Sequence, residues 1–456
     1  MIIAFKKYSM IVGIFCAAHI AILSKLKFFP YPELFIYSYL TKGGLIPYKQ
    51  IFDQHFPGLM FLPVNFASLG IDTVAEMRIV SYLLVVLSHL AIYKISKTIL
   101  KNNKLLLLPN LLFLIWHPSI EGYVLWIDSF AQTTLLWSFY FLLRKGNKNS
   151  FLTGLLLGLT FLLKQTVAPL ILLLGLYLFF KTKSKKTLFP ELYGFLICVL
   201  ALFVWIFALG VWKDFYYWTF IFNITTFAQM GRKTPQIMEL IKIAPVFVLP
   251  ALSLIYMFFK RTEKQLKYLL IFYFGAIFFA LARFDYVHLQ PALPFAILTL
   301  IYLVQLMVKK HSYIVKYTLL FLVFSIVWNA YLLRHFIGSN TYFFGRFESQ
   351  LTSEVNKYRS SGKVFAFGTT PHIYYLTKTL PPGNIFAFQF PWFMKIAEEK
   401  VYYGLVNDPP AVVIRDKNAQ VSGMNLVKNM PKISDYVNKY YKTVEVVGDT
   451  ELMVRN

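Results

Sequence analysis

The feature that most constrains the fold is a succession of long apolar runs. The first extends from Tyr8 to Leu26, and ten more lie near residues 74–99, 104–117, 127–143, 150–163, 166–180, 188–210, 239–259, 266–282, 287–308 and 314–336. A helix of about 20 apolar residues crosses a bilayer. With allowance for tilt, the runs predict an α-helical polytopic membrane protein of about 11 transmembrane helices. Composition agrees, because only 15% of the residues are charged, against about 25% in soluble domains.

Basic residues give the chain a net charge of +25, and their positions decide what that charge means. They gather in the short breaks at residues 6–7, 94–104, 144–148, 181–186, 260–267 and 309–316. Lys and Arg favour short cytoplasmic loops, so these breaks predict a cytoplasmic N-terminus and an extracytoplasmic C-terminal part. A nucleic-acid-binding protein would instead carry a basic patch on one soluble module. We therefore expect a multi-pass plasma-membrane protein and no nucleic-acid partner.

Acidic residues are distributed differently from the basic ones. With this orientation, most acids before residue 340 fall in or beside outer-face segments, and only Glu191 and Glu263 fall on the cytoplasmic side. The rule for Lys and Arg barely constrains Asp and Glu, so the asymmetry suggests a polar site on the outer face. The alternative is that outer loops are longer and hold more residues of every kind.

The character of the chain changes near Gly345. Two short apolar segments, 363–368 and 411–416, end in turn residues and predict buried strands. Residues 396–405 and 433–441 have helical character, and a further strand is expected at 443–447. The expected organisation is a transmembrane domain over residues 1–344 and a small extracytoplasmic α/β domain over residues 345–456.

The first outer loop, residues 27–58, holds the strongest candidates for chemistry. Glu33, Asp53 and His55 lie in it, among prolines, glycines and aromatic residues that suit turns near the headgroup layer. A carboxylate here would serve as a general base toward an acceptor hydroxyl. The three side chains would also suit a divalent ion, and the sequence indicates no cofactor with certainty. The alternative is an ordinary re-entrant connector with solvated acids.

The order of residues in this loop resembles a known family. An acid at Glu33, then Gly43-Gly44-x-x-Pro47-Tyr48 and Phe52-Asp53-x-His55-x-Pro57-Gly58, is similar to the first periplasmic loop of GT-C glycosyltransferases, nearest to protein O-mannosyltransferases and aminoarabinose transferases. The resemblance implies a polyprenyl-phosphate-linked sugar donor. The family's catalytic Asp matches Glu33, which follows Pro32 and no second acid. The family's acidic-x-Lys-Pro-Pro motif is replaced here by the segment that begins at Asp53.

Further segments extend the resemblance along the chain. Lys164, in Phe161-x-x-Lys164-Gln165, would bind a lipid phosphate, since a lysine at membrane depth needs an anion; snorkelling to the interface is the alternative. Arg283 would hold a phosphate bidentately. His288, which precedes a Pro-bearing span, would bind substrate or cap a helix. Asp128 would line the site or cap its helix. Residues 365–382 resemble the family's post-membrane domain.

These observations predict a membrane glycosyltransferase that acts on the outer face. It would move a sugar from a polyprenyl-phosphate donor to a hydroxyl of a protein, glycan or lipid acceptor, with inversion. Glu33 or Asp53 would be the base, Lys164 and Arg283 would hold the donor phosphate, and His55, His288 and Asp128 would contact substrate. The rivals are a transporter or flippase of lipid-linked saccharides and a non-catalytic scaffold, although ionisable residues are few within the spans.

Overall fold

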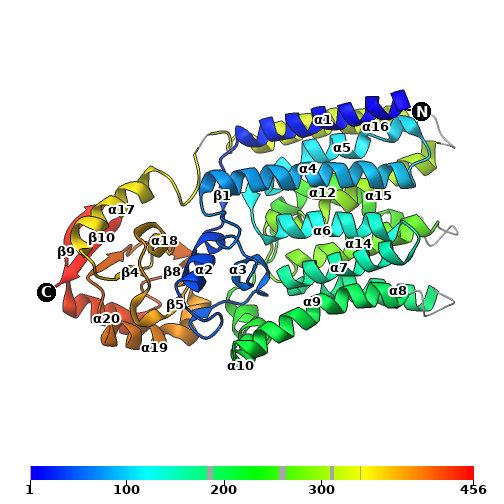
Figure 1. Ribbon diagram of the computed structural model, residues 1–456. Coiled ribbons are helices and arrows are strands. Elements are labelled where there is room, and N and C mark those ends of the chain that lie inside the picture. The colour runs from blue at the N-terminus through cyan, green and yellow to red at the C-terminus, as the bar shows by residue number, and fades with distance from the viewer. Residues whose placement is uncertain (1, 182–187, 256–262, 309–312, 339) are drawn as a thin grey trace. The chain divides into compact units, whose positions relative to one another are not determined.

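The structure is a computed structural model that describes residues 2–181, 188–255, 263–308, 313–338 and 340–456 (Figure 1). By its internal contacts the chain divides into two compact units. Unit 1 comprises Met1–Phe29, Ala75–Leu202 and Lys233–Asn340. Unit 2 comprises Pro30–Val74, Phe203–Arg232 and Thr341–Asn456. The tail therefore forms one unit with the first loop and with a second segment, Phe203–Arg232.

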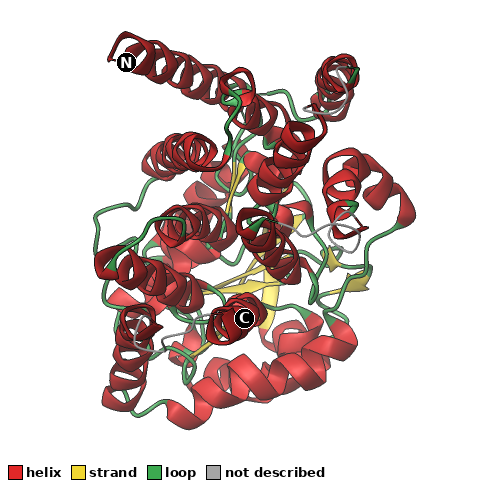
Figure 2. Cartoon of the chain, turned by 90° about the vertical axis from the view of Figure 1, so that its right-hand side faces the viewer, coloured by secondary structure: helices red, strands yellow, loops and turns green. Residues whose placement is uncertain are grey.

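Unit 1 is a bundle of helices that run alongside one another in Figure 1 and are seen nearly end-on in Figure 2. Its helices are α1 (Ile2–Ser24), α4 (Val74–Ile99), α5 (Leu108–Trp116), α6 (Ile127–Leu142), α7 (Asn147–Leu163), α8 (Ala168–Lys181), α9 (Phe189–Ala208), α12 (Ile237–Ala251), α14 (Lys264–Ile277), α15 (Leu293–Val308) and α16 (Ile314–Leu333). Each apolar run in the sequence thus forms a helix, although residues 256–259 of one run lie outside the described residues.

Several of these helices have the length and apolarity needed to cross a membrane. In the part of the chain that the structure describes, five do so over at least 18 residues, within α1, α4, α9, α16 and the segment Ile237–Ile255 that contains α12. Shorter apolar helices follow at Asn103–Trp116, Gln165–Lys181 and Leu293–Val308. The protein is therefore a multi-pass membrane protein, and the number of about 11 spans stays a prediction.

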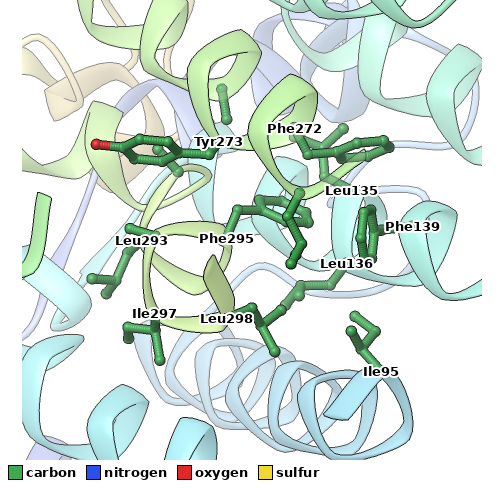
Figure 3. Close-up of a cluster of buried hydrophobic side chains, with 14 of the residues drawn as sticks. Ile95, Leu135, Leu136, Phe139, Phe272, Tyr273, Leu293, Phe295, Ile297 and Leu298 are labelled. Carbon is green, nitrogen blue, oxygen red and sulfur yellow. The ribbon is translucent and has the colours of Figure 1, made fainter. Parts of the chain in front are cut away.

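The core of unit 1 is built from aromatic and branched side chains of α4, α6, α14 and α15 (Figure 3). Phe139 of α6 meets Phe272 of α14 and Phe295 of α15 edge to face, with ring centroids 4.9 and 5.5 Å apart. Such aromatic pairs add to the free energy gained from burial alone. The helices that carry the polar residues described below are therefore held in a packed frame.

Helices α7 and α9 approach each other closely along a seam of glycines. A Cβ added at Gly154 would lie 1.8 Å from the Glu191 carbonyl oxygen, and one added at Gly194 would lie 2.2 Å from the Phe151 carbonyl oxygen. Gly154 and Gly158 have the spacing by which small residues let membrane helices pack backbone against backbone. The absence of side chains at these positions is what allows the contact.

A chain of polar side chains crosses the apolar interior of unit 1. The Asn110 Nδ2 group donates to the His89 carbonyl (2.8 Å) and lies 3.0 Å from His89 Nδ1. His89 Nε2 is 3.0 Å from His19 Nδ1, and His19 Nε2 is 3.1 Å from His117 Nδ1. Because Asn110 donates to His89 Nδ1, each neutral imidazole then donates through Nε2 to the next. All four buried side chains are thereby hydrogen-bonded in one direction.

The tail in unit 2 is an α/β fold around a four-stranded sheet. The strands β4 (Val364–Phe367), β6 (Val412–Arg415), β9 (Tyr441–Val447) and β10 (Thr450–Arg455) are arranged in the order β4-β6-β10-β9. β4 and β6 are parallel, whereas β10 is antiparallel to both of its neighbours. Helices α17 (Arg346–Arg359), α19 (Pro391–Asn407) and α20 (Pro431–Tyr440) accompany the sheet, with short elements α18 (Ile373–Thr377), η9 (Pro382–Asn384), β7 (Gln420–Val421) and β8 (Met424–Asn425).

The strands and helices expected in the tail are found, and the first loop contains structure that the sequence did not predict. Helix α2 (Glu33–Lys42) in the loop was not predicted, and neither were α17 and β10 of the tail. The short helix α3 (Gly58–Phe61) follows at the end of the loop. Strand β2 (Ile51–Phe52) of the loop pairs in parallel with β5 (Phe386–Ala387) of the tail. The Phe386 amide donates to the Gln50 carbonyl at 2.8 Å. Loop and tail are therefore joined by backbone hydrogen bonds.

Substitution of a seam glycine should destabilise the bundle. We expect Gly154→Ala to lower the free energy of unfolding by about 1–3 kcal/mol, since a methyl group at that position overpacks the contact with α9. Gly175→Ala is the matched control, because a Cβ at Gly175 of α8 meets nothing within 4 Å. It should leave stability unchanged or raise it by up to about 1 kcal/mol. Equal thermal unfolding midpoints for the two purified variants would contradict the close approach.

Candidate functional site

Asp53, in unit 2, is a buried carboxylate with both oxygens engaged. The Tyr37 hydroxyl donates to Oδ2 at 2.6 Å, and the His55 backbone amide donates to Oδ1 at 2.7 Å. His55 Nδ1 also lies 3.0 Å from Oδ1. Asp53 is 2% exposed. These hydrogen bonds fix the orientation of the carboxylate. We call Glu33, Tyr37, Asp53 and His55 the loop cluster.

Glu33 is the other carboxylate of the loop cluster, and its surroundings differ. It is the first residue of α2, and its Oε2 is buried and meets no hydrogen-bond partner among the described residues. Burial raises the pKa of the Glu33 carboxyl to about 7, and the negative charge of Asp53 contributes in the same direction. A carboxyl group with a free oxygen and a pKa near 7 can both accept and release a proton at neutral pH.

The backbone around the loop cluster is unusual at Tyr48. This residue has φ = 63°, a left-handed conformation that bulky side chains rarely adopt. Its buried side chain packs edge to face on Phe61, and its hydroxyl donates to the His55 carbonyl at 2.9 Å. The strained turn therefore places a donor where it holds the segment that carries Asp53 and His55. Strain of this kind persists where the surroundings impose it, often at functional sites.

Both the segment after α9 and the tail hold the loop in place. That segment forms the short helical elements α10 (Trp212–Tyr216), η5 (Tyr217–Ile221), η6 (Asn223–Phe227) and α11 (Ala228–Met230). Asn223 Nδ2 donates to the Gln54 carbonyl at 3.0 Å, and Trp218 stacks on Phe52 at 5.0 Å. From the tail, Phe388 contacts the edge of Tyr37. The loop cluster is thus supported on several sides within unit 2.

A second cluster lies in unit 1, where Lys164 meets Asp128 and His288. Lys164 Nζ is 2.9 Å from each Asp128 carboxylate oxygen and 3.0 Å from His288 Nδ1, which is itself 3.0 Å from Asp128 Oδ2. The side chains of Lys164 and Asp128 are 7% and 0% exposed. We call these three residues the lysine cluster. Lys164 therefore does not snorkel, and Asp128 uses both oxygens in the cluster and does not cap its helix.

Three further residues hold the lysine cluster in place. Gln290 accepts a hydrogen bond from the Ser129 hydroxyl at 2.8 Å and donates to the Glu121 carbonyl at 2.8 Å. Glu121 Oε2 accepts from the Val287 amide at 2.8 Å, within the short helix η8 (Tyr286–Leu289) that carries His288. Glu121 has φ = 54°. Burial raises the pKa of its carboxyl to about 7. Glu121 thus anchors the turn that presents His288.

Arg283 belongs to a neighbouring ionic network in unit 1. Its Nε donates to Asp285 Oδ2 at 3.2 Å. Lys233 Nζ approaches Asp285 Oδ1 at 3.0 Å and Glu239 Oε1 at 3.2 Å. These side chains are more exposed than the lysine cluster, so their ion pairs contribute less to stability and are more easily exchanged for contacts with an arriving anion.

The structure therefore gathers the predicted residues into groups within each unit. Glu33, Asp53 and His55 meet in unit 2, and Asp128, Lys164 and His288 meet in unit 1. Arg283 lies in the ionic network around Asp285, and the assigned roles in substrate binding stay predictions. Sequence analysis missed Tyr37, because its hydrogen bond to Asp53 corresponds to no recognisable pattern in the sequence. It also missed Glu121 and Gln290, which act through contacts with residues more than 150 positions away.

A metal ion was one expectation for the loop cluster. Over the residues that the structure describes, no three His, Cys, Asp or Glu side chains are arranged to hold one. Asp53 already has its oxygens turned toward Tyr37 and His55, which suits hydrogen bonding. The divalent ion stays an untested prediction.

The chain was compared with known proteins. Residues 54–212 match the family described as dolichyl-phosphate-mannose-protein mannosyltransferase; this range begins one residue after Asp53 and includes His55, Asp128 and Lys164. No curated protein sequence matches the chain. Two solved structures of ArnT from Cupriavidus metallidurans do match it. The structure bound to undecaprenyl phosphate has a TM-score of 0.62 at 11% identity, and the apo structure has 0.61 at 9%.

Each of these two comparisons covers 99% of this chain and 98% of the other. The chain therefore shares the fold of these ArnT structures. At such low sequence identity the likeness concerns the fold, so the resemblance expected from the first loop is confirmed at that level. Within this fold, the loop cluster and the lysine cluster are the two buried polar groups that contain predicted site residues.

Removal of one partner of the buried ion pair should destabilise the protein strongly. We expect Asp128→Asn or Lys164→Met to lower the free energy of unfolding by about 3–5 kcal/mol, because each leaves a buried charge without its counterpart. The double variant should lose less than the sum of the two single losses. Thermal unfolding of the purified proteins measures this. Lys148→Met, at an exposed position of α7, is the control, and strict additivity would contradict the coupling.

Proposed function

We propose that the protein is a membrane glycosyltransferase that moves a sugar from a polyprenyl-phosphate donor to an acceptor hydroxyl. The observation that carries the proposal is Glu33, with its buried unpartnered oxygen and a pKa near 7 beside the fixed anion Asp53. The GT-C fold supports the same reaction class. So does the likeness to a dolichyl-phosphate-mannose family and to ArnT bound to undecaprenyl phosphate.

In unit 1, Lys164 and Arg283 would bind the donor phosphate. Lys164 is held by Asp128 in a nearly dry environment, where an ammonium group requires an anionic partner. A phosphate oxygen would offer the same charge and would share the ammonium group with Asp128. Arg283, paired to Asp285 through Nε, presents a planar guanidinium with further N–H donors, which suits a phosphate. His288 would donate or accept at the same place, according to its tautomer.

In unit 2, Glu33 would be the general base and Asp53 a fixed negative charge. The acceptor oxygen attacks the anomeric carbon and transfers its proton to Glu33, while the bond from that carbon to the lipid phosphate oxygen breaks. The electron pair leaves with the lipid phosphate, whose charge is stabilised by the cations. A single displacement of this kind inverts the anomeric configuration. Asp53 suits the base role less, because its oxygens are already engaged by Tyr37 and His55.

The reaction would take place on the outer face of the membrane. The basic breaks at residues 94–104, 144–148 and 181–186 favour a cytoplasmic N-terminus. With this orientation the first loop and the tail are extracytoplasmic, as an acceptor in the cell envelope requires. Protein, glycan and lipid hydroxyls all remain candidates for the acceptor.

Glu33→Gln should abolish sugar transfer. The amide cannot take up the proton, and loss of a general base lowers the rate by about 10²–10⁴-fold. The wild-type rate should rise as the pH increases through about 7, because burial and the charge of Asp53 keep Glu33 protonated below that pH. The measurement is transfer from labelled polyprenyl-phosphate sugar in membranes, over a pH series.

The control for this experiment is Asp435→Asn, which removes an exposed carboxylate of α20 in the same unit. It should leave both rate and pH profile unchanged. Unchanged transfer by Glu33→Gln would refute its role as base. Uptake of the labelled lipid by vesicles, without any transferred product in the wild type, would refute the glycosyltransferase assignment and favour a flippase.

A further inference from the structure

A cavity of about 260 Å³ opens at the carboxyl ends of the two parallel strands of the tail. Gly368, Thr369 and Thr370 follow β4 and line it, and Asp416 follows β6. Loops at the carboxyl ends of adjacent parallel strands commonly form ligand sites, because the chain leaves the sheet there in diverging directions. The cavity is slightly smaller than the ~300–1,000 Å³ of sites for drug-sized ligands, which suits a single ring. All of its lining residues belong to unit 2.

The central polar group of the cavity is His372. Its side chain is fully buried, and its Nε2 contacts the Phe343 carbonyl oxygen. A carbonyl only accepts, so Nε2 carries the hydrogen and Nδ1 is a lone-pair acceptor in the neutral ring. Burial lowers the pKa of the imidazole to about 4, so the ring is neutral at physiological pH. Nδ1 meets no hydrogen-bond partner among the described residues, although it is buried.

Two half-buried carboxylates add further acceptors. The Gly345 amide donates to Glu348 Oε2 and the Asn418 amide donates to Asp416 Oδ1, each at 2.8 Å. Each carboxylate therefore has one oxygen held by a backbone amide and a second that can accept from a ligand. Together with His372 Nδ1, the cavity presents acceptors that need several O–H or N–H donors from its occupant.

The remaining lining residues determine what kind of hydrogen-bonding ligand can occupy the cavity. Aromatic rings of Phe343, Phe388 and Phe390 supply apolar faces, and the hydroxyls of Thr369 and Thr370 can donate or accept. Among the described lining residues none is Lys or Arg, so the cavity offers no counter-charge to a phosphate or carboxylate. An uncharged ring that carries hydroxyls at its edge and C–H groups on its faces meets both requirements.

We propose that this cavity is a binding site for a neutral sugar residue. The hydroxyls of the sugar donate to His372 Nδ1, Glu348 and Asp416, and one face of its ring lies against the phenylalanines. A buried histidine nitrogen that otherwise has no partner among the described residues would thereby accept a hydrogen bond, which removes an unfavourable desolvation.

The place of the cavity in unit 2 suggests what the sugar is for. Phe388 and Phe386, which line the cavity, contact the Tyr37 ring with centroids 5.7 and 6.1 Å away, and the Tyr37 hydroxyl donates to Asp53. The cavity wall thus contacts the loop cluster through the Tyr37 ring, which lies between the two phenylalanines and Asp53. The bound sugar is then a residue of a glycan acceptor, and this assignment rests on the proposed function, whereas sugar binding itself does not.

Binding can be tested without any donor lipid. The full chain in lipid nanodiscs, free of sugar-headed detergents, is titrated with methyl α-glucopyranoside, methyl α-mannopyranoside and methyl N-acetylglucosaminide. Saturation-transfer NMR detects the bound sugar. We expect at least one glycoside to bind, and inorganic phosphate not to compete. His372→Gln keeps a donor toward the Phe343 carbonyl and loses the Nδ1 acceptor, so it should weaken binding about tenfold.

A steric variant keeps the test independent of that hydrogen bond. Ala419→Phe fills the cavity and should abolish binding, whereas Asn418→Phe places the same ring on the exposed neighbouring residue and should not. No binding of any glycoside, competition by phosphate, binding of cationic amines alone, or unchanged binding by Ala419→Phe would each overturn the proposal. Sugar binding without transfer activity would instead refute the proposed function and leave the binding site standing.

Discussion

The ion pair of Lys164 and Asp128 imposes the arrangement of the polar part of unit 1. An ammonium group with 7% exposure, in a bundle of apolar helices, has no water to solvate it. Its carboxylate partner comes from the first turn of α6, and His288 comes from η8. Lys164 itself is extended, with φ = −157° and ψ = 120°, so α7 ends there and the chain restarts in η3 (Gln165–Val167) before α8. One electrostatic requirement thus fixes the position of three segments and explains the break between two helices.

Unit 1 pairs opposite charges, whereas unit 2 holds two carboxylates close together. The Asp53 carboxylate accepts hydrogen bonds from the hydroxyl of Tyr37 and the amide of His55. Glu33 lacks such donors on its buried oxygen, so burial and the neighbouring anion favour its protonated form. The surroundings of the two acids therefore suit them to different functions. This separation is the usual way in which a pair of carboxylates divides the roles of fixed charge and proton acceptor.

Much of the secondary structure follows from local sequence patterns. Apolar runs predicted where the helices of unit 1 lie, although several helix ends differ by a few residues, and the short apolar segments 363–368 and 411–416 predicted β4 and β6. The nearness of Asp53 to His55 was also predictable from their spacing. The lysine cluster was not, because its contacts join residues 36 and 124 positions apart. The same holds for His19, His89 and His117, which no periodicity connects.

The pairing of the loop with the tail is the part of the structure that sequence patterns predict least well. Strands β2 and β5 have only two residues each and pair across more than 300 positions, so neither shows the alternation by which longer strands are recognised. Yet this short pairing sets Phe386 and Phe388 against Tyr37. The Tyr37 ring contacts both phenylalanines while its hydroxyl donates to Asp53, so the cavity wall and the support of that carboxylate share one side chain. The tail and the loop therefore act as one packed body, in which occupancy of the cavity and the geometry of the loop cluster depend on the same ring.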